Sequence, residues 1–124
     1  MDSVVHFEIP TKDMKRAQKF YDIFGWHMDD IPAMHYTLVQ TGKTDKKGML
    51  AEKGFINGGL TEKSAKITAP LVYINVKSID ETLKMIEKKG GKTLQEKTNI
   101  QGNMYSAYFT DSEGNVMGLI EGSM

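Results

Sequence analysis

The chain of 124 residues contains no cysteine, only three prolines and a single tryptophan, and its formal net charge is zero. The absence of cysteine excludes disulfides, thiolate nucleophiles and cysteine-based zinc or iron–sulfur sites. Catalysis by this chain would therefore depend on histidine, carboxylate, lysine, tyrosine or hydroxyl side chains.

An excess of charge of one sign and long apolar runs are also missing. Sixteen basic residues balance sixteen acidic ones and are interspersed with them, which predicts no nucleic-acid partner. No stretch approaches the ~20 apolar residues of a membrane-spanning helix, and Met1 is followed by Asp2 rather than by a basic and then an apolar segment. We therefore expect a soluble, cytoplasmic protein with no membrane partner. With 40% hydrophobic residues, the sequence has enough apolar material for one core, and we expect residues 1–124 to form one domain or two small repeated halves of it.

Near the start of the chain, the spacing of hydrophobic residues changes from the alternation of a strand to the three- and four-residue spacing of a helix. The segment "VVHFEIP", residues 4–10, alternates apolar and polar side chains, which is typical of a strand with His6 and Glu8 on its mixed face. The next segment, "TKDMKRAQKFYDIFGW", predicts an amphipathic helix of about three turns that begins after Asp13 and ends before Gly25. Its apolar stripe consists of Met14, Ala17, Phe20, Tyr21 and Phe24.

Three strands are expected after this helix. They lie at residues 27–30, 35–42 and 58–63, and the polar, glycine-broken segment 43–54 predicts an exposed loop between the last two. Trp26 follows the end of the helix, where an aromatic side chain favours a contact between helix and sheet.

The pattern then restarts at residue 71. A strand at 71–76 places Tyr73 and Asn75 on the face opposite its β-branched residues. A second helix follows, with Ser78 and Glu81 in capping-box spacing and two glycines at its end. Its apolar stripe consists of Ile79, Leu83 and Ile86. Further strands are expected near residues 93–94, in "MYSAYFTD" and in "VMGLIEG".

The chain is therefore a strand–helix–strand–strand–strand unit written twice, with module one at about residues 1–64 and module two at about residues 69–124. The predicted fold class is α+β: two tandem βαβββ modules form a curved mixed sheet, a half-open barrel around a cavity, with the helices outside. Such a cavity suits a small-molecule ligand. We also expect a homodimer, in which the modules pair either within a chain or across the dimer.

Two segments carry a resemblance to a known superfamily. "VVHFEIPTKDMKRAQKFYDIFGW" and "YFTDSEGNVMGLIE" resemble the first strand and helix and the closing turn and strand of the vicinal-oxygen-chelate group. That group includes glyoxalase I, extradiol dioxygenases, fosfomycin-modifying enzymes and bleomycin-resistance proteins. The middle segment "NGGL" and the helix end "FGW" resemble a glyoxalase-related subfamily of small predicted enzymes.

The resemblance implies four metal-ligand positions, on the first and last strand of each module. In this chain they are occupied by His6, Gly59, Leu71 and Gly118. A single imidazole does not hold a divalent metal, so we predict neither a metal site nor a cofactor. Glu62 and Glu121 lie three residues beyond the glycines and therefore on the opposite strand face.

Glycine within a strand often marks a place where something approaches the backbone closely. Two interpretations of Gly59 and Gly118 remain open. Either glycine is what was left when a ligand carboxylate was no longer needed, or the ring of a substrate or cofactor lies against the bare backbone.

The remaining candidates line the predicted cavity. His6 is the expected proton shuttle, because the pKa of imidazole lies near neutrality. Glu8, two residues on, either pairs with His6 and raises that pKa or lies at the solvent-exposed rim of the cavity. In residues 104–111 the more polar alternate set faces the cavity, which favours Tyr108. The expected catalytic residue is His6, and the expected substrate-binding residues are Glu8, Gly59, Tyr73, Asn75, Tyr108 and Gly118.

Three functions fit these observations. The first is a metal-independent, glyoxalase-like enzyme that acts on a small polar carbonyl or hydroxyl compound. The second is a non-catalytic protein that sequesters a small molecule, as bleomycin-resistance proteins do. The third is an interaction module without a ligand.

Overall fold

The computed structural model describes residues 1–43 and 54–122, so most of the expected loop at 43–54 lies outside the described residues. The chain divides into two compact units. We call His6–Pro70 the N-terminal unit, and Leu71–Met124 together with Met1–Val5 the C-terminal unit. Within the described residues, no helix is long and apolar enough to cross a membrane.

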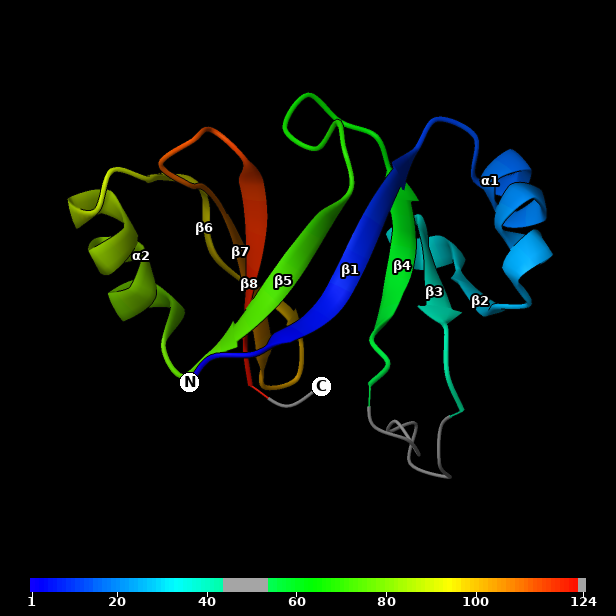
Figure 1. Cartoon of the computed structure of the whole chain (residues 1–124), viewed down its shortest axis with the longest axis horizontal. Helices are drawn as coiled ribbons and strands as arrows, with labels where there is room; N and C mark the ends of the chain where they lie inside the picture. The colour runs from blue at the N-terminus through cyan, green and yellow to red at the C-terminus, as the bar shows by residue number, and fades with distance from the viewer. Residues whose placement is uncertain (44–53, 123–124) are drawn as a thin grey trace. The chain divides into compact units, whose positions relative to one another are not determined.

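The elements of both units follow the order that the sequence predicts (Figure 1). The first module consists of β1 (Val4–Thr11), α1 (Met14–Tyr21), the 3-10 turn η1 (Asp22–Phe24), β2 (His27–Ile31), the 3-10 turn η2 (Pro32–Met34), β3 (Tyr36–Gln40) and β4 (Asn57–Glu62). The second consists of β5 (Leu71–Val76), α2 (Ile79–Lys88), β6 (Lys92–Gln101), β7 (Met104–Thr110) and β8 (Val116–Glu121). The predicted α+β fold with two βαβββ modules is confirmed.

Each module builds the same four-stranded sheet. The strand order is β2-β3-β4-β1 in the first module and β5-β8-β7-β6 in the second. The first and last strand of each module run parallel, β1 with β4 and β5 with β8, and the other pairs are antiparallel. The repeat that the sequence shows is therefore also a repeat of strand pairing.

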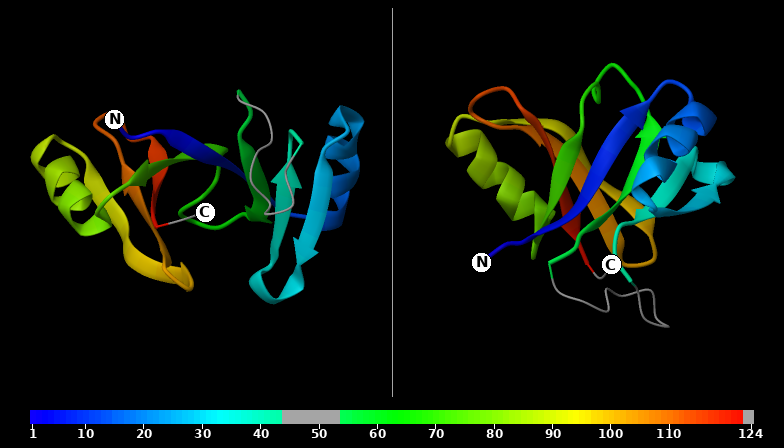
Figure 2. Two further views of the ribbon diagram at one scale, coloured as in Figure 1. Left: turned by 90° about the horizontal axis from the view of Figure 1, so that it is seen from below. Right: turned by 45° about the vertical axis from the view of Figure 1, so that its right-hand side comes forward.

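The C-terminal unit has a hydrophobic core between α2 and its sheet. Figure 2 shows α2 along one face of β6, β7 and β8. The cluster consists of the buried residues Val76, Ile79, Leu83, Ala107, Phe109 and Leu119, with Ile74, Ile86, Tyr105 and Met117 packed against it. The side chains of Tyr73 and Tyr108 are absent from this cluster, as the alternation of each strand predicts.

The helix ends follow the capping rules on which the sequence prediction rested. The carboxylate of Asp13 accepts a hydrogen bond from the backbone N of Arg16 at 3.0 Å, and the Ser78 hydroxyl accepts one from the backbone N of Glu81 at 3.2 Å. Gly25 adopts a left-handed φ of 72° after η1, a conformation that favours glycine.

The apolar stripe predicted for α1 is only partly covered. No residue of α1 is buried, and Phe20 and Phe24 are each 59% exposed. Tyr21 stacks on Trp26 with ring centroids 5.4 Å apart, and Trp26 in turn lies 5.8 Å from the ring of Phe7 on β1. Trp26 thus makes the helix-to-sheet contact expected of it.

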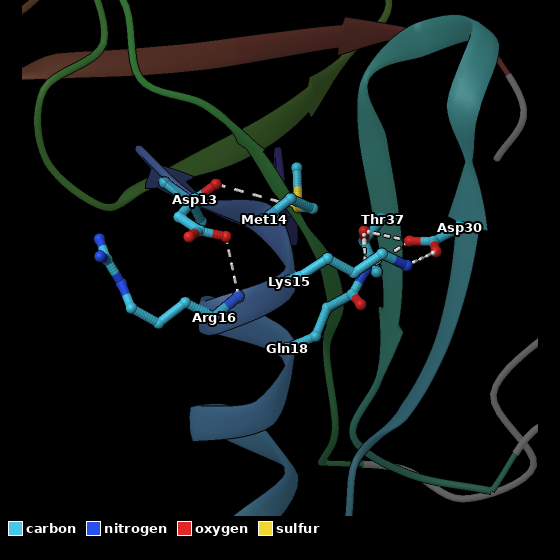
Figure 3. Close-up of polar contacts among 8 residues, drawn as sticks. Asp13, Met14, Lys15, Arg16, Gln18, Asp30 and Thr37 are labelled. Carbon is cyan, nitrogen blue, oxygen red and sulfur yellow. Dashed lines mark hydrogen bonds and ion pairs between the residues drawn. The ribbon is translucent and has the colours of Figure 1, made fainter.

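A polar cluster also ties α1 to β2 and β3 (Figure 3). The Thr37 hydroxyl, fully buried, donates to Asp30 Oδ1 at 2.8 Å and accepts from Gln18 Nε2 at 2.9 Å. Gln18 Nε2 also donates to Asp30, whose other oxygen pairs with Lys15 Nζ at 3.0 Å. The contacts from Lys15 and then from Thr37 lower the pKa of the Asp30 carboxyl.

One strand is much longer than the sequence predicts. A strand was expected only near residues 93–94, but β6 extends from Lys92 to Gln101 and pairs with β7 through several register shifts. Most of its side chains are exposed. Because β6 is a polar edge strand without a buried face, it lacks the alternation that identifies a strand in a sequence.

Removing the buried hydroxyl of Thr37 should weaken the attachment of α1. We expect Thr37→Val, which keeps the shape of the side chain, to lower the free energy of unfolding in urea by about 1–2 kcal/mol, because Gln18 and Asp30 lose a buried partner. The control, Thr68→Val at an exposed position, should change it by less than about 0.5 kcal/mol. Equal effects of the two substitutions would contradict this account of the cluster.

Candidate functional site

The mixed face of β1 carries two buried polar side chains. His6 is 8% exposed and Glu8 is 5% exposed. The sequence places both on this face, but burial of Glu8 differs from the rim position typical of a carboxylate. The imidazole Nε2 of His6 lies 2.8 Å from the hydroxyl Oη of Tyr36, which comes from β3.

The contact between His6 and Tyr36 crosses an intervening strand. The strand order β3-β4-β1 puts β4 between them, and β4 presents Gly59 beneath the tyrosine ring. A Cβ atom at Gly59 would overlap the hydroxyl and the outer ring carbons of Tyr36. Tyr36 reaches His6 only because position 59 has no side chain.

The C-terminal unit repeats this arrangement with other residues. The hydroxyl groups of Tyr73 on β5 and Tyr108 on β7 lie 2.5 Å apart. Gly118 on β8 is the register partner of both residues, and a Cβ atom there would lie 2.6 Å from Cε2 of Tyr73. In each unit, therefore, a tyrosine passes over a glycine on the middle strand to reach a polar group two strands away.

These contacts give the two glycines a role that neither sequence-based interpretation included. The space above Gly59 and Gly118 is filled by tyrosine side chains of the protein itself, Tyr36 and Tyr73. Glycine is required at both positions because a protein ring lies against the backbone.

Burial determines the charge of His6. Desolvation lowers the pKa of the His6 imidazole from 6.5 to about 4 because a buried imidazolium loses its hydration. The net shift is thus opposite in direction to the increase that pairing with Glu8 would bring. At neutral pH the His6 imidazole is therefore uncharged and takes part in hydrogen bonds in its neutral form.

The other predicted residues have structural contacts. The side-chain amide of Asn75 donates to the backbone carbonyls of Ile120 and Gly122, both at 3.4 Å. Leu71 is 5% exposed and offers no donor atom. The cavity that the sequence predicts between the two modules stays a prediction, as does the role of each predicted residue in binding or catalysis.

The carboxylates near the two glycines are also engaged elsewhere. Glu121 accepts a hydrogen bond from the backbone N of Ile79 at 2.8 Å and pairs with Lys97 Nζ at 2.9 Å. These contacts, the one from Ile79 first, lower the pKa of its carboxyl. Glu62 lies 3.4 Å from the ring of His35 in an exposed pair. Glu121 thus accepts a hydrogen bond from the first residue of α2.

The residues at the four family ligand positions do not fit a divalent metal. Gly59 and Gly118 lie under tyrosine rings, Leu71 is apolar, and only His6 has a donor atom. Across residues 1–43 and 54–122, no group of three or more histidine or carboxylate side chains is arranged to hold a metal ion.

Comparisons with known proteins agree with this architecture. Residues 3–42 match the model of the bleomycin resistance protein-like N-terminal family. A glyoxylase-like domain-containing protein of Didymella fabae is 33% identical over 115 residues, which cover 87% of this chain and 84% of the relative.

Solved structures show the same fold at low sequence identity. A glyoxalase/bleomycin resistance protein/dioxygenase superfamily member of Vibrio splendidus superposes with a TM-score of 0.65 at 12% identity, covering 98% of this chain and 100% of the other. A hypothetical protein of Bacillus halodurans gives 0.64 at 18% identity, covering 99% and 96%. Because the Didymella fabae relative is 33% identical over most of both chains, this chain belongs to the glyoxalase-like family, as the resemblance in its sequence implies.

Sequence reasoning did not find Tyr36. It lies in a strand that was predicted, but nothing in a single strand shows that its hydroxyl bonds to a residue two strands away. One feature of the sequence did point to such a contact. Each module has a glycine at the same place in its last strand, and a glycine inside a strand often marks a place where another group approaches the backbone closely.

The buried imidazole should make stability depend on pH. Above about pH 6.5 His6 is neutral in both states, whereas between about pH 6.5 and pH 4 only the unfolded chain binds the proton, so wild type should lose up to about 3 kcal/mol of stability there. His6→Gln, which does not titrate, should lose that much less between about pH 7 and pH 4 in urea unfolding.

A matched control is His27→Gln at an exposed position. Its pH profile should run parallel to that of wild type, because the substitution does not touch the buried imidazole. If the His6→Gln profile were also parallel, burial would not control the protonation of His6.

The pairing of Gly59 with Tyr36 can be tested by a double-mutant cycle. Gly59→Ala should destabilise wild type by about 1–3 kcal/mol because the new methyl group displaces the tyrosine. The same substitution in a Tyr36→Ala background should cost much less, since the space is then open. Equal costs in the two backgrounds, measured by urea unfolding, would show that Tyr36 does not depend on Gly59.

Proposed function

We propose that this protein is a glyoxalase-like enzyme that acts on a small polar carbonyl or hydroxyl compound without the divalent metal of its metal-dependent relatives. One observation carries the proposal: a phenol occupies the space where the family resemblance puts a carboxylate, at Gly59 and again at Gly118. A phenol offers a hydrogen bond to a ligand oxygen, whereas a neutral phenol is a poor ligand for a divalent metal.

The two tyrosine contacts support a role in orienting a ligand. Each joins a buried polar group to a less buried tyrosine: His6 to Tyr36, and Tyr73 to Tyr108. Hydrogen bonds to such groups hold a carbonyl or hydroxyl compound in one orientation, which is a large part of what an enzyme site contributes.

A second function, sequestration of a small molecule without chemistry, is favoured by the match of residues 3–42 to the bleomycin resistance protein-like family. The ligand would then be held and returned unchanged. The zero formal net charge provides no general attraction for a cationic drug, so this function would rest on hydrogen bonds and shape.

The metal-free proposal predicts the result of a metal titration. Equilibrium dialysis of the purified protein against Zn²⁺, Ni²⁺, Mn²⁺ and Fe²⁺, followed by elemental analysis, should show no stoichiometric uptake. The matched variant is His6→Gln, which should give the same background level. One metal ion per wild-type chain, lost in His6→Gln, would overturn the proposal.

A thermal-shift screen against small carbonyl and hydroxyl metabolites separates the two functions. A compound that binds the native state should raise the melting temperature, and above Kd the increase should grow with the logarithm of the concentration of the compound. Mass spectrometry of the hit after incubation should then show conversion for the enzyme and unchanged compound for a sequestering protein. No stabilisation by any compound would favour an interaction module instead.

A further inference from the structure

The N-terminal unit has a pocket at the end of its sheet where β2 begins, β3 ends and β4 begins. Gly25 and His27 line it from the start of β2, residues 40–43 from the end of β3, and Phe55 from the segment before β4. Its volume of about 480 Å³ lies within the range of about 300–1,000 Å³ that is typical of small-molecule sites. None of the lining residues is a predicted site residue or occupies a family ligand position.

Hydrogen bonds between described residues hold the walls of this pocket in place. The backbone N of Thr41 donates to Oδ1 of Asn57 at 2.9 Å, and the Thr41 hydroxyl donates to the backbone carbonyl of Ile56 at 2.7 Å. His27 and Gln40 are register partners on β2 and β3, so their side chains lie next to each other on one sheet face. The pocket is therefore formed before a ligand enters, which lowers the entropic cost of binding.

One wall of the pocket is an aromatic ring on a glycine. A Cβ atom at Gly42 would lie 2.7 Å from Cγ of Phe55, so the Phe55 ring packs against the bare backbone there. Phe55 is nevertheless 38% exposed. Across the pocket, a Cβ atom at Gly25 would meet nothing within 4 Å, which leaves open space above its backbone. A flat ring fits between these two groups and can stack with an offset on Phe55.

The charges of the lining favour an anion. Lys43 contributes an exposed ammonium group, and none of the lining residues is a carboxylate. The nearby carboxylate of Asp29 is engaged by His27, whose Nε2 lies 3.1 Å from both of its oxygens. The side-chain amide of Gln40 adds an uncharged N–H donor. An ammonium group next to an amide donor can bind a carboxylate through charge-assisted hydrogen bonds.

We propose that this pocket binds a small aromatic carboxylate, with the carboxylate on the Lys43 ammonium and the ring between Phe55 and the backbone of Gly25. An inorganic anion such as phosphate would meet the ammonium but would leave the aromatic wall unused. Binding here does not depend on the proposed enzymatic function, because it involves neither the two tyrosine contacts nor the family ligand positions.

The binding test is an NMR titration of the whole ¹⁵N-labelled chain with benzoate, benzamide and acetate. Benzamide has the ring of benzoate without its charge, and acetate has the charge without the ring. We expect benzoate to shift the backbone amide resonances of Gly25 and Gly42 saturably. Benzamide should bind about fivefold more weakly, which corresponds to the loss of one exposed ion pair, and acetate about tenfold more weakly, because it lacks the stacking contact.

A lysine variant identifies the cation. Lys43→Met keeps the aliphatic part of the side chain and removes its charge, so it should lower the affinity for benzoate about fivefold and leave the affinity for benzamide unchanged. The matched control is Lys66→Met at an exposed position of the same unit, outside the pocket, which should bind benzoate as wild type does. Both lysines are exposed, so both variants should unfold at the same urea concentration as wild type.

Several results would overturn the proposal. Equal affinity for benzamide and benzoate would remove the role of the charge, and equal affinity for acetate and benzoate would remove the role of the ring. The absence of a saturable shift at Gly25 and Gly42, or wild-type affinity for benzoate in Lys43→Met, would remove the site itself. Metal uptake and metabolite conversion test the proposed function separately, and neither result alters how this titration is interpreted.

Discussion

A tyrosine side chain can lie across the middle strand of a sheet only where that strand presents a glycine. This steric constraint operates in both units, at Gly59 beneath Tyr36 and at Gly118 beneath Tyr73. The hydrogen bonds between Tyr36 and His6 and between Tyr73 and Tyr108 both depend on it. It also decides which chemistry these faces offer, because a carboxylate at the glycine position and the tyrosine above it cannot occupy the same space.

Much of the fold follows from local rules that a sequence displays directly. The caps at Asp13 and Ser78 and the alternation in β5 and β7 each act over a few residues, so they predict helix starts and strand faces well. The length of β6 could not be predicted, because a polar edge strand is defined by its partner rather than by its own pattern. The exposure of Phe20 and Phe24 depends on how Tyr21 and Trp26 pack, which is a tertiary effect.

The sequence predicted which strand face each candidate residue lies on, but it did not predict which side chains contact one another. Strand parity puts His6 and Glu8 on one face of β1, and Tyr73 and Tyr108 on the face away from the α2 core. The pairing of His6 with Tyr36 joins residues 30 positions apart, and the lowered pKa of His6 follows from burial that only the folded chain creates. Composition and spacing carry neither of these facts.

The overlap between the Tyr36 ring and any side chain at position 59 also restricts the order in which this sequence can change. A larger residue at 59 displaces the tyrosine, and a smaller residue at 36 leaves both a cavity and a buried imidazole deprived of its phenol contact. Either substitution alone lowers stability, while the two together cost less than the sum of the single effects, because the smaller residue at 36 leaves room for the larger one at 59. Among descendants of this chain, positions 36 and 59 should therefore covary, and any side chain at 59 calls for a change at 36.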